Sequence, residues 1–286
     1  MRNAMTAAGA GIALGMLIST VSASTLYSDW MNRSTFDASS NGWAVQSYSK
    51  GKGSFGRTPG AVDSNTAFRY PVQIDGSGTV TETNTVTTSS FAPPTSGNYV
   101  EFDAAIKINW SSARQAGLVF ALSAYGTNSE GETDAMNIEF VTKQINAVDT
   151  NGVSYDNLEL TSFNDYTSGG DRWFETVESG VNSTDNYHTY GMRLYPNEVD
   201  YLVDGNVFAY TNDYVPTGTN LALELNAWAP DSSWPSAEAP LDDNTFWYMD
   251  VSWVTVTSGV GTPPSHGAAL LAPEPGTAML GLGGLV

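Results

Sequence analysis

Alternation of apolar and polar residues with a period of two is the feature that most constrains this chain. Between Thr25 and Ser258 the sequence is a series of short alternating runs separated by Gly, Asn, Asp and Pro, without a convincing amphipathic helix. Successive side chains of a strand point to opposite faces of a sheet, so such runs predict strands. The predicted strands are Tyr99–Ile108, Gly117–Ala124, Asn137–Thr142, Tyr187–Leu194, Val199–Val203, Val207–Tyr210, Leu221–Trp228 and Phe246–Thr257.

This pattern predicts an all-β fold. Asp204-Gly205-Asn206 lies between two of the runs and is a short hairpin signal, because Gly tolerates the positive φ that such turns need. Residues 24–258 show neither an internal repeat nor a break in composition. We therefore expect a single domain, built as a two-sheet antiparallel β-sandwich or jelly roll.

Composition excludes several classes of function. The 286 residues include 11 Lys and Arg against 30 Asp and Glu, a formal net charge of -19, which argues against nucleic acid because no basic stripe displaces its counterions. The chain has no cysteine, so it forms no disulfide, thiolate nucleophile or cysteine metal site. With two histidines, a multi-His metal centre is not expected, and neither is a cofactor.

The N-terminal residues predict export. Arg2 precedes an apolar run from Ala7 to Ile18, and Val21-Ser22-Ala23 then places small residues where a signal peptidase cleaves. The run is shorter than the roughly 20 residues that a bilayer span needs. We interpret residues 1–23 as a signal peptide, with a buried helix as the alternative.

The C-terminal residues resemble a sorting signal. A Gly, Pro, Ser and Ala linker over 259–272 precedes Pro273-Glu274-Pro275 and an apolar stretch over 276–286. This resembles the PEP-CTERM signal of Gram-negative bacteria, which implies processing by an exosortase and delivery to the cell surface or extracellular matrix. The Arg-rich end of that signal is absent and the apolar stretch is short, so residues 273–286 are interpreted as a truncated signal or one with compromised anchoring. The alternative is a Gly-Leu tail without a sorting role.

An ordered set of segments resembles glycoside hydrolase family 16, the concanavalin-like jelly-roll glucanases. The segments are Tyr99–Lys107, Gly117–Ala124, Asn137–Phe140, Tyr187–Tyr190, Val199–Gly205, Leu225–Ala229 and Val251–Val256. The resemblance implies a jelly roll whose concave sheet forms an open cleft for β-glucans, galactans or related polysaccharides. Fold resemblance alone does not establish activity, which depends on the residues at the site.

The segment from Ala135 to Phe140 matches the strand that carries catalysis in that family. The resemblance makes Glu139 the acid/base, and it places Ala135 at the nucleophile and Asn137 at the assisting Asp. A bulged register would instead use Asp134 and lose the middle acid at Met136. Alanine offers no nucleophile, and asparagine cannot carry the charge of an aspartate, so retaining hydrolysis is not favoured.

An inverting reaction would require a second carboxylate about 6.5 to 9.5 Å from the acid. Asp165 and Asp171 are candidates from loops, although no motif supports them. Glu139 itself has the alternative interpretation of a solvated acid on a strand.

The remaining candidates fit sugar binding, which combines flat aromatic faces with short polar side chains. The resemblance points Asn226, Trp228 and His188 into the cleft, beside Asn137, and Trp173 is a candidate platform at its rim. The alternative for these Trp residues is a place in the sandwich core.

The last predicted strand contains one candidate metal ligand. Family members often hold calcium through an Asp in the last strand, where this chain has Ser252, with Asp250 two residues earlier on the same face. Asp250 is therefore a candidate calcium ligand, although calcium needs six to eight oxygen ligands.

The predicted function is an exported protein that binds polysaccharide through a glycosidase-like cleft with a degenerate catalytic motif. One alternative is an active endo-acting glycoside hydrolase on a β-glucan or galactan, with Glu139 as the acid/base. The other alternative is a structural protein of the surface or biofilm matrix without a ligand.

Overall fold

The structure of the protein is a computed structural model. It describes residues 23–31, 42–48, 56–59, 66–74, 80–81, 83–110, 118–142, 144–145, 147–148, 152–166, 172–228 and 246–266. The predicted signal peptide, apart from its last residue, and the predicted sorting segment over 273–286 lie outside these ranges.

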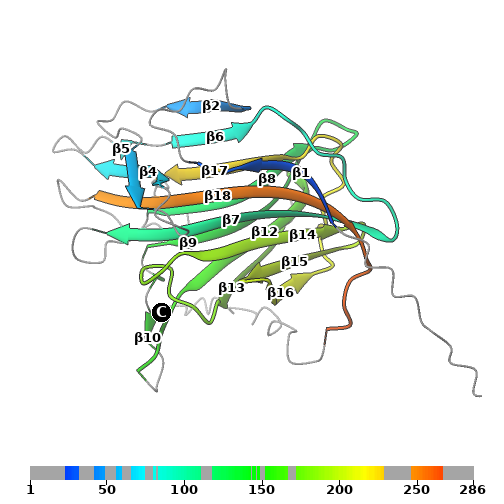
Figure 1. The fold of residues 1–286 in the computed structure, drawn as a ribbon. Helices are drawn as coiled ribbons and strands as arrows, with labels where there is room; N and C mark the ends of the chain where they lie inside the picture. Colours follow the sequence, from blue (N-terminus) through cyan, green and yellow to red (C-terminus); the bar gives the residue numbers. More distant parts are fainter. Residues whose placement is uncertain are drawn as a thin grey trace, which may run out of the picture.

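The described strands form two large antiparallel sheets. The order in the nine-stranded sheet is β16 (Asn206–Thr211), β15 (Glu198–Val203), β14 (His188–Tyr195), β7 (Asn98–Trp110), β18 (Phe246–Val260), β4 (Thr66–Ile74) and β3 (Gly56–Pro59). Two further strands of this sheet, β1 (Ser24–Asp29) and β5 (Val80–Thr81), pair with β18 and β4. Figure 1 shows β18 in orange, running through the middle of the molecule beside β7.

The second sheet has seven described strands. Their order is β13 (Trp173–Glu178), β12 (Asn157–Tyr166), β9 (Thr133–Val141), β8 (Val119–Thr127), β17 (Ala222–Trp228), β6 (Thr83–Thr87) and β2 (Trp43–Tyr48). A small hairpin is formed by β10 (Ala147–Val148) and β11 (Ser154–Tyr155).

The core lies between the two large sheets. Alternation directs Phe102 and Ile106 of β7 inward from one sheet, and Ile138 and Phe140 of β9 inward from the other. The rings of Phe140 and Tyr190 meet edge to face, with centroids 4.7 Å apart, and so join the sheets. Burial of each large apolar side chain contributes about 1.5 to 3 kcal/mol, which explains why alternating strands pack in this way.

The predicted all-β sandwich is confirmed. The predicted turn joins β15 to β16, and its two central residues, Asp204 and Gly205, have φ values of 49° and 76°, as a type I′ hairpin requires. The described residues contain no helix long and apolar enough to cross a membrane.

The chain departs from the predicted strand pattern in the number of its strands and at the C-terminal end of the domain. The predicted runs left out β1 to β6 and β10 to β13, and among these β12 and β13 extend the seven-stranded sheet beyond β9. The last strand, β18, continues to Val260, inside the predicted linker, and the amide of Gly261 still donates to the carbonyl of Gly97 at 2.9 Å. Folded structure therefore extends past the predicted end of the domain.

Candidate functional site

The strand β9 directs the three predicted active-strand residues to one face. Met136, Ile138 and Phe140 point into the core. Ala135, Asn137 and Glu139 alternate with them and lie on the opposite side, which we call the outer face of the seven-stranded sheet. The sequence therefore predicted the relative orientation of these three residues correctly.

The neighbouring strands complete this outer face. In the register with β12, Glu139 is opposite Glu159 and Asn137 is opposite Thr161. The remaining cross-strand neighbours on this face are Phe163 opposite Ala135 from β12, and Ala121, Ser123 and Tyr125 from β8 opposite Glu139, Asn137 and Ala135. Polar residues therefore occupy two adjacent rows, and aromatic residues occupy the row of Ala135.

Glu139 and Glu159 form a buried carboxyl pair. Their exposed fractions are 2% and 1%, and directly opposed residues have Cβ atoms about 4.5 to 5.5 Å apart. Gln144 donates its Nε2 to Glu159 Oε1 at 2.6 Å. Burial, and then repulsion from Glu159, raise the pKa of Glu139 to about 8, although Arg172 and Asn137 act in the opposite direction. Glu139 is therefore largely protonated at neutral pH.

The two other active-strand positions lack an acid. Asn137 donates its Nδ2 to Thr161 Oγ1 at 2.7 Å and approaches Glu139 Oε1 at 3.5 Å. Ala135 is 0% exposed and lies between the strand positions of Tyr125 and Phe163. A methyl group between two aromatic residues supplies no nucleophile.

Aromatic side chains lie beside these polar rows. Tyr125 is 42% exposed and Phe174 is 37% exposed. Phe174 belongs to β13 and is opposite Thr161, so it shares the outer face, and the Arg172 guanidinium lies 5.3 Å from its ring centroid. Exposed aromatic rings next to amide and hydroxyl groups are typical of sugar-binding surfaces.

Asn226 reaches the same face from β17. It is registered opposite Ala121, which in turn is opposite Glu139, so Asn226 lies two strands from Glu139, or roughly 10 Å. Its Nδ2 is 3.4 Å from Ser123 Oγ. The backbone of Trp228 ends β17, and its side chain lies outside the described part of the chain.

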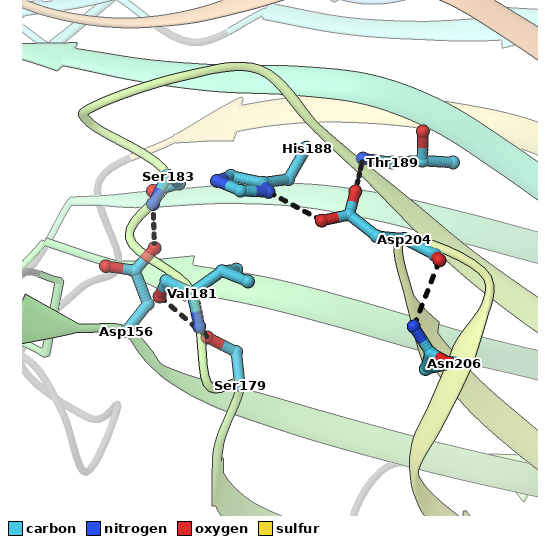
Figure 2. A network of polar contacts seen from close by, with 8 residues as sticks. All are labelled: Asp156, Ser179, Val181, Ser183, His188, Thr189, Asp204 and Asn206. Atoms are coloured by element: carbon cyan, nitrogen blue, oxygen red, sulfur yellow. Dashed lines mark hydrogen bonds and ion pairs between the residues drawn. The ribbon is translucent and has the colours of Figure 1, made fainter.

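His188 is not brought to this face, contrary to our expectation. It begins β14 in the nine-stranded sheet, where it is opposite Ile106. Figure 2 shows its ring directed at Asp204 of the β15–β16 turn, with Nδ1 2.8 Å from Oδ2. Asp204 also accepts the Thr189 amide at 2.9 Å, so the turn carboxylate holds the start of β14.

Trp173 is also placed differently from the predicted rim platform. It is half-buried against the core, and its ring stacks on Tyr201 with centroids 5.6 Å apart and planes 22° apart. The order of residues in β13 explains the difference, because alternation turns Trp173 inward and the next residue, Phe174, outward. The core alternative for Trp173 is the one that the structure supports.

Asp250 does not fit a calcium site. Arg69 binds its carboxylate with both Nε and Nη2, each at 2.7 Å, and Asn109 donates a further short hydrogen bond. The carboxylate is 1% exposed and its oxygens already face a guanidinium cation. A divalent ion at this position would meet repulsion from Arg69, so the residues around Asp250 do not suit calcium.

The second carboxylate of the site was missed by sequence reasoning. The two loop acids considered as partners of Glu139, at positions 165 and 171, have side chains outside the described part of the chain. Glu159 is the carboxylate that the structure brings to Glu139. Alternation in Leu158-Glu159-Leu160 was the available signal, but the partner of this strand depends on the folded sheet.

Two curated relatives resemble the chain over part of its length. A β-glucanase of Bacillus subtilis (strain 168) is 28% identical over 123 residues, and a β-glucanase of Bacillus licheniformis is 26% identical over 123 residues. Each match covers 43% of this chain and 45% of the relative. The chain therefore matches less than half the length of these relatives.

Solved structures share the fold over most of the chain. The Bacillus licheniformis β-glucanase has a TM-score of 0.53 at 18% identity, covering 80% of this chain and 96% of that one. A family 16 protein of the Bacteroides ovatus mixed-linkage glucan locus, in complex with its product, has a TM-score of 0.59 at 15% identity, with coverage of 81% and 99%. The model of the glycosyl hydrolases family 16 matches residues 62–254. This match spans more than half of the chain, so the protein belongs to glycosyl hydrolases family 16.

Proposed function

We propose that the outer face of the seven-stranded sheet binds a β-linked glucan or galactan without hydrolysing it by the retaining mechanism. Membership of a polysaccharide-degrading family supports a glycan ligand. Exposed Tyr125 and Phe174 beside Asn137, Thr161 and Asn226 offer the combination of apolar and polar contacts that sugars require.

The observation that carries the proposal is Ala135. Retaining hydrolysis needs two carboxyl groups about 5 to 5.5 Å apart, one of which attacks the anomeric carbon. The position that the family uses for this attack holds a buried methyl group, and the acid in the same strand, Glu139, is only 2% exposed. A glycosidic oxygen would have to displace neighbouring groups before it met that acid.

The Glu139–Glu159 pair favours a second candidate function, hydrolysis with an altered pair of carboxyl groups. In this candidate, protonated Glu139 would donate its proton to the leaving glycosidic oxygen. Glu159 would either attack the anomeric carbon or take a proton from the attacking water, which inverts the configuration. Directly opposed residues have Cβ atoms about 4.5 to 5.5 Å apart. This spacing is nearer to the carboxyl separation of about 5 to 5.5 Å in retaining enzymes than to the roughly 6.5 to 9.5 Å of inverting ones.

The experiment measures polymer retention and release of reducing ends in parallel. The full chain is incubated with lichenan, laminarin, agarose and carrageenan. We expect retention on at least one polymer without release, and we expect Tyr125→Ala or Phe174→Ala to weaken retention at least about fivefold, equivalent to roughly 1 kcal/mol of lost stacking. Trp30→Ala is the matched control, because Trp30 is an exposed aromatic residue, 50% accessible, that follows β1 of the other sheet.

The outcomes separate the candidates. Release of reducing ends that both Glu139→Gln and Glu159→Gln abolish would replace the binding proposal with the hydrolase. If the polymers retained Tyr125→Ala and Phe174→Ala as well as wild type, the outer face would be excluded as the binding surface. Failure of all four polymers to retain the protein would favour a structural role without a ligand.

We also infer export to the cell surface or extracellular matrix of a Gram-negative bacterium. The inference rests on residues 1–23 as a signal peptide and on residues 273–286 as a sorting segment read by an exosortase. N-terminal sequencing of the cell-associated protein should begin at residue 24. An intact Met1 on protein recovered from the cytoplasm alone would contradict it.

A further inference from the structure

A cluster of two carboxylates and a histidine lies on the nine-stranded sheet, away from the outer face of the seven-stranded sheet. Glu198 and Asp200 alternate with the core residues of β15 and therefore share the side of the sheet that faces away from the core. His266, in the segment that follows β18, reaches both of them. Its Nε2 is 2.8 Å from Glu198 Oε1 and 3.1 Å from Asp200 Oδ1.

Asp200 is an unusual member of this cluster. Its side chain is 0% exposed, and neither of its oxygens accepts a hydrogen bond from the described part of the chain. The shorter contact of His266 Nε2, at 2.8 Å, is with Glu198 Oε1. Arg193 is opposite Asp200 in the sheet, but its Nε donates to Glu101 at 2.6 Å. A buried carboxylate that shares one imidazole nitrogen with a second carboxylate is incompletely satisfied, so it favours a cation at the position that it faces.

The imidazole is held in a fixed orientation. Its ring stacks on Tyr210 with centroids 3.9 Å apart and planes 15° apart. Tyr210 is registered opposite Asp200 on β16, so the same pair of strands positions the ring and the carboxylate. Ligands whose rotamers are fixed by packing bind a metal ion with less loss of entropy.

We propose that Glu198, Asp200 and His266 bind a divalent transition-metal ion, with Zn²⁺ as the best match. One atom from each residue lies within 4.8 Å of the other two. A tetrahedral ion with bonds of about 2.0 Å separates its ligand atoms by roughly 3.3 Å, so the observed spacing requires small side-chain movements only. Imidazole with carboxylates suits Zn²⁺, whereas Ca²⁺ prefers six to eight oxygen ligands. Water would complete the coordination.

The ion would connect the segment that follows β18 to β15 of the nine-stranded sheet. His266 comes from the segment over 261–266, whereas Glu198 and Asp200 belong to β15. A shared ion would cross-link this segment to the sheet. Because it would bind only the folded protein, its stabilising effect would grow as the free ion concentration exceeds the Kd.

Zinc binding by the full chain tests the proposal. After removal of metal with a chelator and dialysis, calorimetric titration with Zn²⁺ should give one ion per chain and should raise the melting temperature. His266→Ala and Asp200→Asn should each weaken Zn²⁺ binding at least about tenfold. His188→Ala is the matched control, because His188 is the other histidine of the chain and also contacts a carboxylate, at 2.8 Å. This control should bind Zn²⁺ like wild type.

The alternative is a protonated imidazole that bridges the two carboxylates without a metal. It predicts that His266→Ala lowers the melting temperature in metal-free buffer, while wild type takes up no Zn²⁺ at millimolar concentration. That result, or equal Zn²⁺ binding by wild type and His266→Ala, would overturn the proposal. If both variants fail to fold by circular dichroism, wild type with Co²⁺ decides: intense visible absorption of four-coordinate Co²⁺ supports the site, and its absence contradicts it.

Discussion

Glu139 lies on the outer face of the seven-stranded sheet in surroundings that favour its protonated form. Burial of the carboxyl group is the largest cause, and repulsion from Glu159 adds to it. The ordinary pKa of the group is 4.5, and its pKa in the folded protein is about 8. The unfolded chain therefore releases this proton over a pH range in which the folded protein retains it, so folding is disfavoured as the pH rises through this range.

We predict that Glu139→Gln weakens the pH dependence of stability. The contribution of Glu139 is complete below pH 4.5 and is lost as the pH rises to about 8. Glutamine has no proton to lose, so the free energy of unfolding of this variant relative to wild type should increase with pH, by on the order of a few kcal/mol overall. Urea denaturation at several pH values between about 5 and 8 measures the difference.

An exposed glutamate provides the control for this experiment. Glu130 lies in the turn between β8 and β9 and is solvent-exposed. Glu130→Gln should shift stability by a similar small amount at every pH. A difference between Glu139→Gln and wild type that stays constant from pH 5 to 8 would show that Glu139 is ionised throughout.

The connection between β16 and β17, over residues 212–220, packs against the end of β8 and the start of β9 in the seven-stranded sheet. Asp134 of β9 is buried, and its Oδ2 accepts the Thr217 amide at 2.7 Å. The adjacent Gly218 packs so closely that an added Cβ would lie 2.9 Å from the Thr127 carbonyl oxygen and 3.2 Å from Asp134 Oδ2. The connection over residues 212–220 is therefore packed closely against the ends of β8 and β9, with its backbone atoms at the contact.

We predict that Gly218→Ala lowers the free energy of unfolding by about 1 to 3 kcal/mol. The Thr127 carbonyl belongs to β8 and cannot rotate away as a side chain would, so the connection itself must move. Gly261→Ala is the control, because its added Cβ would meet the nearest Tyr99 atom at 3.5 Å, an ordinary contact. Urea denaturation measures the two midpoints. Equal shifts of the midpoint from wild type in Gly218→Ala and Gly261→Ala would contradict this prediction.

The two large sheets turn opposite sides of the molecule outward, and these sides have different roles in our interpretation. Tyr125 lies on the outer face of the seven-stranded sheet. The Arg69–Asp250 pair joins β4 to β18 in the nine-stranded sheet and is bidentate and largely buried. Substitutions on opposite sides share no contact, so their effects should be independent.

We predict that glycan retention and stability can be changed separately. Asp250→Asn should lower the free energy of unfolding by about 1 to 3 kcal/mol, because Arg69 loses a charged partner, and it should leave polymer retention unchanged. Tyr125→Ala should do the reverse, since its ring is 42% exposed. Polymer pull-down and thermal melting of the same preparations measure both quantities. If folded Asp250→Asn lost polymer retention, the result would indicate that the glycan binds the nine-stranded sheet and would contradict our proposal.

Much of the architecture could be predicted because alternation is local. The run from Tyr99 to Ile108 and the Asp204-Gly205 turn indicate their structure within a few residues, and both are confirmed. Strands such as β12 were missed, and the sheet to which β14 belongs, which decides where His188 lies, was not predicted. Sheet membership depends on pairing between distant segments, and periodicity within one segment carries no information about it.

The candidate sites show the same division. The sequence by itself determined that Ala135, Asn137 and Glu139 share one face, because a strand period of two leaves no other arrangement. Only the tertiary structure decided that Glu159 faces Glu139, that Trp173 turns inward, and that His266 meets Glu198 and Asp200. These relations arise when whole strands come into register and chain ends pack on the sheet, and the free energy that selects them is shared by the entire core.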